Sequence, residues 1–431
     1  MGQEVLANAA LVSRIIKGNS VLVEVDGSVR RITFEDLISS INAGDQQLLS
    51  QVAWGVPIKQ SVQSSPVWGM VGNTQMWNEF KDRIGRYLLT NDGKAAKLSK
   101  TNSGIYADGT TLDETKGHIM GIMPDRLYYR VVVDATTGIP YLWGSMIPIG
   151  GHHIDPIAVG AYLGSMSGSA LTSRSGVKPV GSKTISAFWN AAQVNGKDFG
   201  IGNLDFRKVL IMLNLFEYGN PNVQTNIGYG VGGSSGKDLW STASQLLTGA
   251  TKSLGDSCGK IDISVVNGDI VGDNCSRVSL FGWEDTYNWL WEMIQGVYFG
   301  SSDNANQDGS EIFLYEGNRM PTSAELASHP NGEFRQLTRI TSSGYVQEMI
   351  LGEFFDIFAK KHGGGSTSYW CDYDYANTTG QLLLWGGSAS VGTYAGLGYA
   401  YSAYAFSSAG SPFGARLAYY GPLTIVNGNE I

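Results

Sequence analysis

Residues 385 to 421, WGGSASVGTYAGLGYAYSAYAFSSAGSPFGARLAYYG, combine aromatic, hydroxyl and very small side chains almost without charge. Arg416 is the one charged residue of this segment, and no Asp, Glu, Lys or Arg occurs from Tyr375 to Ala415. Tyrosine offers a large, rigid contact area with a polar tip, and Ser and Gly adapt around it, as in antibody paratopes. The composition therefore indicates either a ligand-binding surface or a buried structural segment.

The two interpretations make different predictions for the aromatic residues of the segment. Aromatic side chains at a spacing of two also describe a half-buried strand, in which every second ring packs in the core. We expect Tyr394, Tyr401 and Tyr404 to lie on a binding surface, and Tyr399 and Phe406 to pack in the core.

Arg416 lies in the short motif GARL, among small and apolar residues. A lone guanidinium in such surroundings predicts a buried or half-buried side chain, whose donors bind carbonyl groups or a carboxylate.

Residues 303 to 311, DNANQDGSE, are the one candidate metal site. Asp303, Asn306 and Asp308 place oxygen atoms around a glycine turn, which is the chemistry that Ca²⁺ prefers. The spacing departs from the EF-hand loop, so an ordinary acidic turn is the alternative. We expect no other metal and no cofactor.

Catalytic motifs are not recognisable in this chain. The histidines lack zinc-binding spacing, and SGSAL around Ser169 does not match a nucleophile elbow. Paired carboxylates for glycoside hydrolysis are defined by their separation in space, so they stay open, but no repeat typical of a β-solenoid depolymerase is present. We expect a protein that is not an enzyme.

The composition of the chain argues against several other classes of protein. With 431 residues, 42% hydrophobic, the chain can bury a large core, while 57 glycines predict short elements and abundant loops. A net charge of −8 without a basic face argues against nucleic-acid binding. We find no secretory signal pattern and no apolar run long enough to cross a bilayer. Three cysteines are too few for a disulfide scaffold, although Cys258 and Cys275 could pair.

The pattern of elements divides the chain into three regions. Residues 1–56 predict a hairpin around Asp26 and Gly27, a helix capped by Thr33 and a second helix over 44–54. Together these elements indicate an attachment or oligomerisation region. Residues 57–123 predict a connector with one amphipathic helix that is capped by Thr74 and ends at residues 91–93. Its apolar face consists of Trp77, Phe80, Ile84, Tyr87 and Leu88.

Residues 124–431 predict one α+β domain dominated by loops. A hairpin around residues 136–138 is followed by two helices, in SKTISAFWNAAQVNG and NLDFRKVLIMLNLFEYG, and the second is apolar on all sides and therefore buried. Short aromatic strands follow, in RVSLFGWEDTYNWLWEMIQGVYFG and EIFLYEGN.

This order of hairpin, FWNAAQ helix, FRKVLIMLNLFEYGN helix and terminal WGGSAS…GARLAYYG resembles the C-type lectin fold of the formylglycine-generating-enzyme type. It resembles in particular the variable proteins of diversity-generating retroelements and phage tail receptor-binding proteins. The resemblance implies a diversified display surface between the glycine pair and GARL. It does not imply the enzyme activity, because the catalytic cysteine pair is missing and only Cys371 lies in that half.

The resemblance assigns residues of the segment to two groups. The display surface would consist of Ser388, Ser390, Val391, Thr393, Tyr394, Tyr401, Ala403, Tyr404, Ser408, Gly410 and Pro412. The scaffold beneath it would consist of Trp385, Gly386, Gly387, Gly396, Gly414, Arg416 and Leu417.

The expected function is that of a phage tail-fibre or receptor-binding protein that binds a protein or glycan on the bacterial surface. Such a chain would be made in the host cytoplasm, assemble as a homotrimer, contact other tail proteins through residues 1–56 and reside in the virion tail. The alternatives are a retroelement-diversified adhesin of the bacterium itself and a tail-spike polysaccharide depolymerase.

Overall fold

The computed structural model describes residues 20–25, 28–33, 46–60, 69–235, 243–263, 265–266, 269–270, 274–330 and 332–431. It is a mixed α and β fold, mostly short strands with few helices, as the composition predicted. In the described part of the chain, no helix combines the length and the apolar character needed to cross a membrane.

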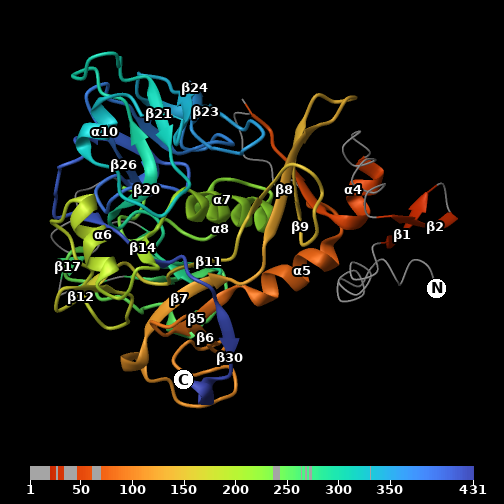
Figure 1. The fold of residues 1–431 in the computed structure, drawn as a ribbon, viewed down its shortest axis with the longest axis horizontal. Coiled ribbons are helices and arrows are strands. Elements are labelled where there is room, and N and C mark those ends of the chain that lie inside the picture. The colour runs from red at the N-terminus through yellow and green to blue at the C-terminus, as the bar shows by residue number, and fades with distance from the viewer. Residues whose placement is uncertain are drawn as a thin grey trace.

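Two large sheets form most of the molecule (Figure 1). The first has seven strands in the order β14 (Phe199–Ile201), β29 (Leu417–Tyr419), β11 (Ile157–Gly160), β7 (His118–Met123), β5 (Gly85–Leu89), β6 (Lys94–Lys97) and β30 (Thr424–Val426). The second has nine strands, of which eight follow the order β22 (Arg335–Thr338), β21 (Glu311–Leu314), β20 (Trp291–Phe299), β26 (Leu382–Trp385), β27 (Ala400–Tyr404), β25 (Tyr373–Tyr375), β23 (Gly344–Met349) and β24 (Ala359–His362). The ninth, β28 (Phe413–Gly414), pairs with β20.

Smaller sheets complete the strand architecture. A five-stranded sheet has the order β10 (His152–Ile154), β8 (Leu127–Val133), β9 (Pro140–Ser145), β3 (Trp54–Pro57) and β4 (Val71–Gly72). A three-stranded sheet consists of β15 (Gly259–Asp262), β18 (Ser276–Leu280) and β19 (Trp283–Glu284). Two-stranded sheets pair β1 (Ser20–Val25) with β2 (Ser28–Thr33), β12 (Ser165–Ser167) with β13 (Ala170–Thr172), and β16 (Val265–Val266) with β17 (Asp269–Ile270).

Helix α7 (Leu204–Tyr218) lies in the middle of the molecule (Figure 1). The Asn203 side chain accepts a hydrogen bond from the backbone N–H of Phe206 at its start, and Gly219 ends it in the left-handed conformation at φ 60°. Nearly all of its residues are buried, because it packs against both β3 and β20. This confirms the prediction of a helix without a solvent face and explains how one core joins the sheets.

The other predicted helix of this part of the chain is also present. Helix α6 (Ile185–Gln193) begins after Thr184, whose hydroxyl accepts from the N–H of Ala187. Two helical turns that the pattern did not predict are α8 (Val223–Asn226) and α10 (Ser323–Ala327). The predicted hairpin around residues 136–138 is the pair β8 and β9.

The connector helix is shorter than predicted. Helix α5 (Thr74–Arg83) is capped by Asn73, and it buries Trp77 and Phe80. Ile84 already has extended backbone, and Tyr87 and Leu88 belong to strand β5, so these apolar residues face a sheet and not a helix. The turn at residues 91–93 therefore joins β5 to β6 and does not end the helix, which corrects the prediction.

The predicted division of the chain does not coincide with the packing. Strands β5, β6 and β7 of the supposed connector share a sheet with β11, β14, β29 and β30, and Leu48 and Val56 pack in the same core as Leu204. The first hairpin, β1 with β2, and helix α4 (Gln46–Val52) agree with the pattern. The predicted helix after Thr33 lies outside the described residues.

Candidate functional site

Six tyrosines form a continuous surface on the nine-stranded sheet, which we call the tyrosine face. They come from β23, β25 and β27 and from a 3₁₀ turn, η3 (Gly392–Tyr394), and they are Tyr345, Tyr373, Tyr375, Tyr394, Tyr401 and Tyr404. Strand register brings them together, because Tyr345 lies opposite Tyr373 and Tyr375 lies opposite Tyr401. The sequence predicted a surface position for only three of these six, namely Tyr394, Tyr401 and Tyr404 of the terminal segment.

The rings of the tyrosine face pack against one another in two stacks. Tyr373 and Tyr394 are parallel with centroids 4.4 Å apart, and Tyr345 meets Tyr394 edge to face at 5.2 Å. Tyr375 and Tyr401 are parallel at 4.5 Å, and Tyr404 continues this stack at 5.5 Å from Tyr401. Since Tyr373 and Tyr375 are two residues apart on β25, both stacks lie on the same side of the sheet.

The tyrosine face is open to solvent at its two outer rings. The exposed fraction is 42% for Tyr394 and 39% for Tyr375, and the other four rings are half-buried. Burial, with smaller contributions from Tyr404 and Tyr375, raises the pKa of Tyr401 to about 12. The Tyr401 phenol therefore stays neutral at physiological pH, so that its hydroxyl can both donate and accept hydrogen bonds.

A second layer of aromatic residues supports the tyrosine face. Trp291 lies 5.3 Å from Tyr401, and the buried Phe413 meets Tyr404 at 4.7 Å. Tyr399 and Phe406 are 2% and 6% exposed, which confirms that these two rings belong to the core. On β27, Ala400 and Ser402 are buried, and a register shift in its pairing with β26 accompanies the placement of Tyr401 and Tyr404 on the same face.

The remaining residues assigned to the display surface differ in their exposure. Ser390, Val391, Thr393, Ala403, Ser408, Gly410 and Pro412 are half-buried. Ser388 is only 1% exposed and lies in the interior beside Trp289, with which it forms a β-bridge. Its assignment to a display surface was therefore wrong, because a buried residue cannot contact a ligand at the surface.

The residues assigned to the scaffold, namely Trp385, Gly386, Gly387, Gly396, Gly414, Arg416 and Leu417, are all buried. The Trp385 indole donates to the carbonyl of Leu397 at 2.7 Å and so closes the loop that carries Tyr394. Gly386 and Gly387 have φ of 82° and 87°, a conformation that other residues rarely adopt. A Cβ on Gly396 would lie 2.1 Å from the Asp372 carboxylate, which explains the absence of a side chain there.

Arg416 is 1% exposed, and its guanidinium is fully paired. Its Nε donates to both Glu292 carboxylate oxygens at 2.9 and 3.0 Å. Nη1 donates to the carbonyls of Gly160 and Ala161, and Nη2 to those of Glu284 and Asp285, at 2.6 to 3.1 Å. The predicted buried guanidinium is thus confirmed, and it joins β11 of the seven-stranded sheet to β20 of the nine-stranded sheet.

Asp372 lies against the loop that carries Tyr394. It is 5% exposed, its Oδ2 accepts from the backbone N–H of Gly398 at 2.7 Å, and its Oδ1 accepts from the Cys371 thiol at 3.4 Å. Burial raises the pKa of this carboxyl from 3.8 to about 7. A group that holds its proton near neutral pH therefore adjoins the candidate binding surface.

The candidate calcium loop is closed by its own hydrogen bonds. The Asp308 carboxylate accepts from the N–H of Ser310 at 2.8 Å, and Glu311 accepts from Asp308 and Gly309. Among the described residues, no group of three or more His, Cys, Asp or Glu side chains could hold a metal ion. The geometry favours the ordinary acidic turn.

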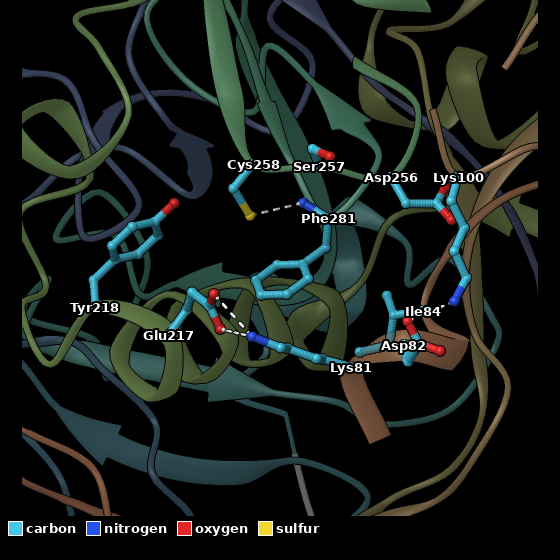
Figure 2. Close-up of a pocket in the computed structure, with 10 residues that line it drawn as sticks. All are labelled: Lys81, Asp82, Ile84, Lys100, Glu217, Tyr218, Asp256, Ser257, Cys258 and Phe281. Carbon is cyan, nitrogen blue, oxygen red and sulfur yellow. Dashed lines mark hydrogen bonds and ion pairs between the residues drawn. The ribbon is translucent and has the colours of Figure 1, made fainter. Parts of the chain in front are cut away.

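A charged pocket of about 380 Å³ lies on another part of the molecule (Figure 2). Its Lys81 ammonium pairs with Glu217 at 2.8 Å, and the carboxylate of Asp256 accepts from the backbone of Arg86. Burial raises the pKa of the Cys258 thiol to about 12, so this cysteine is protonated at neutral pH and is a poor nucleophile. Cys258 and Cys275 are both free thiols, so the alternative of a disulfide between them is wrong.

Neither a protein-family model nor a curated protein matches the chain. Among the solved structures that align with it at low similarity are two variants of one protein. The Major Tropism Determinant I1 variant has 10% identity and a TM-score of 0.24, over 94% of this chain and 93% of that one. The Major Tropism Determinant M1 variant has 11% identity and a TM-score of 0.20, over 95% and 93%. Scores this low do not establish a shared fold.

Proposed function

We propose that the chain is a receptor-binding protein of a phage tail, which binds a bacterial surface ligand through the tyrosine face. The observation that carries the proposal is this face itself. Aromatic side chains with neutral polar tips dominate the energetics of recognition surfaces, because they bury a large area at a low cost in side-chain entropy. Here they are held rigid by mutual stacking and by the layer beneath.

The lack of charge on the terminal segment supports binding over catalysis. No ionisable acid or base other than tyrosine occurs from residue 376 to 415. Contact by aromatic stacking and hydroxyl hydrogen bonds does not require such groups, whereas general acid–base catalysis does. The resemblance to C-type lectin-like variable proteins, with a display surface on a fixed scaffold, belongs to the same proposal.

The assembly is proposed as a homotrimer attached through the N-terminal region. The β1–β2 hairpin lies beside α4 and projects from the body (Figure 1), which supports a role in attachment. Light scattering of the purified chain should give three times the monomer mass of 46.3 kDa. A particle that stays monomeric at micromolar concentration contradicts the trimer but leaves the binding proposal standing.

The decisive experiment measures adsorption of the fluorescently labelled full chain to a panel of bacterial strains. The variant Tyr375→Ser/Tyr394→Ser removes the two most exposed rings of the tyrosine face and should reduce adsorption at least tenfold. The control is Tyr128→Ser, which removes a half-buried tyrosine on β8 of the five-stranded sheet. Adsorption that is equal for wild type and the double variant would place the binding site elsewhere.

A further inference from the structure

A second pocket, of about 270 Å³, lies next to the tyrosine face. Its lining is polar and uncharged, and it consists of Asn222, Gln224, Thr225, Tyr229, Ser366 and Thr367, together with Thr393 of η3. Amides, aliphatic hydroxyls and one phenol thus surround a space without a carboxylate, ammonium, guanidinium or imidazole. This chemistry is opposite to that of the charged pocket in Figure 2.

The floor of this pocket is preorganised. Asn222 and Gln224 are 5% and 7% exposed. Gln224 Nε2 donates to the carbonyl of Gly392 at 3.0 Å, so the amide is held in one orientation against the loop that carries η3. Asn222 Oδ1 caps α8 by accepting from the N–H of Thr225 at 3.0 Å, while its Nδ2 lies 3.4 Å from the carbonyl of Ser366. Fixed amides recognise a ligand without a further ordering cost.

Thr393 connects the pocket to the tyrosine face. Its hydroxyl lies 3.4 Å from the hydroxyl of Tyr345, whose ring meets Tyr394 edge to face. Thr393 and Tyr394 are also neighbours in η3. The pocket therefore adjoins the tyrosine face through the contact between Thr393 and Tyr345.

We propose that this pocket binds one neutral sugar residue of a bacterial surface glycan, while the tyrosine face contacts the adjoining rings. A sugar presents neighbouring hydroxyls, each a donor and an acceptor, which amides and hydroxyls match on both counts. Its C–H faces pack on aromatic rings. The uncharged lining favours neutral sugars over uronic or sialic acids, since a buried carboxylate would have no cationic partner there.

The size of the pocket agrees with a single ring. Sites for drug-sized ligands measure roughly 300–1,000 Å³, and the pocket at about 270 Å³ is slightly smaller. This inference rests on the proposed function and deepens it, because it specifies the receptor as a glycan and not a protein.

The test uses a strain to which the full chain adsorbs, with cells pretreated by periodate, which cleaves vicinal diols of sugars, or by proteinase K. We expect periodate to abolish adsorption and proteinase K to leave it unchanged. A neutral monosaccharide such as glucose, galactose or N-acetylglucosamine should compete better than glucuronic acid. Adsorption that survives periodate and is lost after proteinase K overturns the glycan proposal but leaves receptor binding intact.

A substitution in the pocket tests whether the sugar binds there. Thr393→Val removes one pocket hydroxyl without changing side-chain shape, and the loss of one hydrogen bond should weaken adsorption roughly three- to tenfold. Thr424→Val on β30 is the matched control at an exposed threonine outside the pocket, and melting curves of both variants verify folding. If folded Thr393→Val adsorbs like wild type, the pocket is not the sugar site. Normal adsorption of Tyr375→Ser/Tyr394→Ser instead refutes the proposed function itself.

Discussion

The tyrosine face and the buried ionic cluster, which consists of Arg277, Glu284, Asp285, Glu292 and Arg416, differ in the kind of contact that holds them together. The face has stacked rings and no charge, whereas each cluster side chain is at most 4% exposed and paired with another charge. Loss of one ring from a neutral aromatic stack leaves no buried charge without a partner. Removing one partner of a buried ion pair leaves the other without compensation. Loss of one side chain should therefore cost more stability in the charged interior than on the tyrosine face.

The largest effect on stability is expected for Arg416→Ala. The change leaves Glu292 and four backbone carbonyls without their donor, and it should lower the free energy of unfolding by on the order of 2 to 4 kcal/mol. Chemical denaturation measures the change. Arg126→Ala is the control, because its ion pair with Asp155 is solvent-exposed and should contribute much less to stability. Equal stability of wild type and Arg416→Ala would contradict the expectation that the buried ion pair contributes more to stability than contacts at the surface.

The buried carboxyl of Asp372 should make the stability of the folded protein depend on pH. Its pKa is raised in the folded protein to about 7 from an ordinary 3.8, so the folded state holds the proton more tightly than the unfolded chain. This contribution to stability is therefore fully present below the unfolded pKa and is lost as the pH rises toward 7, by at most about 1.4 kcal/mol per pH unit. Melting temperatures between pH 4 and 8 measure it.

The variant Asp372→Asn isolates this carboxyl from the other buried acids. The amide can still accept from Gly398, but it does not titrate, so the melting temperature should depend less steeply on pH than in the wild type. Identical pH profiles for the two proteins would mean that Asp372 is ionised in the folded state at neutral pH.

The smallest effect on stability is expected for Tyr375→Ser/Tyr394→Ser. Each change removes one ring of a partly exposed stack, which should lower the free energy of unfolding by less than about 1 kcal/mol per residue. The melting temperature should stay within a few degrees of wild type even where adsorption is lost. Global unfolding of this variant would show that the tyrosine face is a structural layer.

The elements that local chemistry specifies were predictable from the sequence. Capping by Asn203 and Thr184 and the apolar runs behind them predict α7 and α6, and a glycine turn predicts the β8–β9 hairpin. The helical spacing of Trp77 and Phe80 extends by coincidence into Tyr87, where sheet pairing prevails over periodicity.

The candidate site was only half predictable, because strand register completes it. Tyr345, Tyr373 and Tyr375 lie outside the terminal segment, and only the pairing of β23 with β25 and of β25 with β27 brings them onto one face with Tyr401. The alternation of Tyr373 and Tyr375 around Asp374 was the one local signal for them. Ser388 has the same residue type as Ser390, and only the bridge to Trp289 places it inside.

The position of Arg416 has a consequence for how this chain can change over time. Two residues before it, β28 ends in the nine-stranded sheet, and one residue after it, β29 begins in the seven-stranded sheet. Trp385 fixes the other end of the segment in β26. A residue inserted into or deleted from β26, β28 or β29 would therefore break the strand register or displace the guanidinium from Glu292. A change of length that keeps these contacts would have to lie in the loops between the strands.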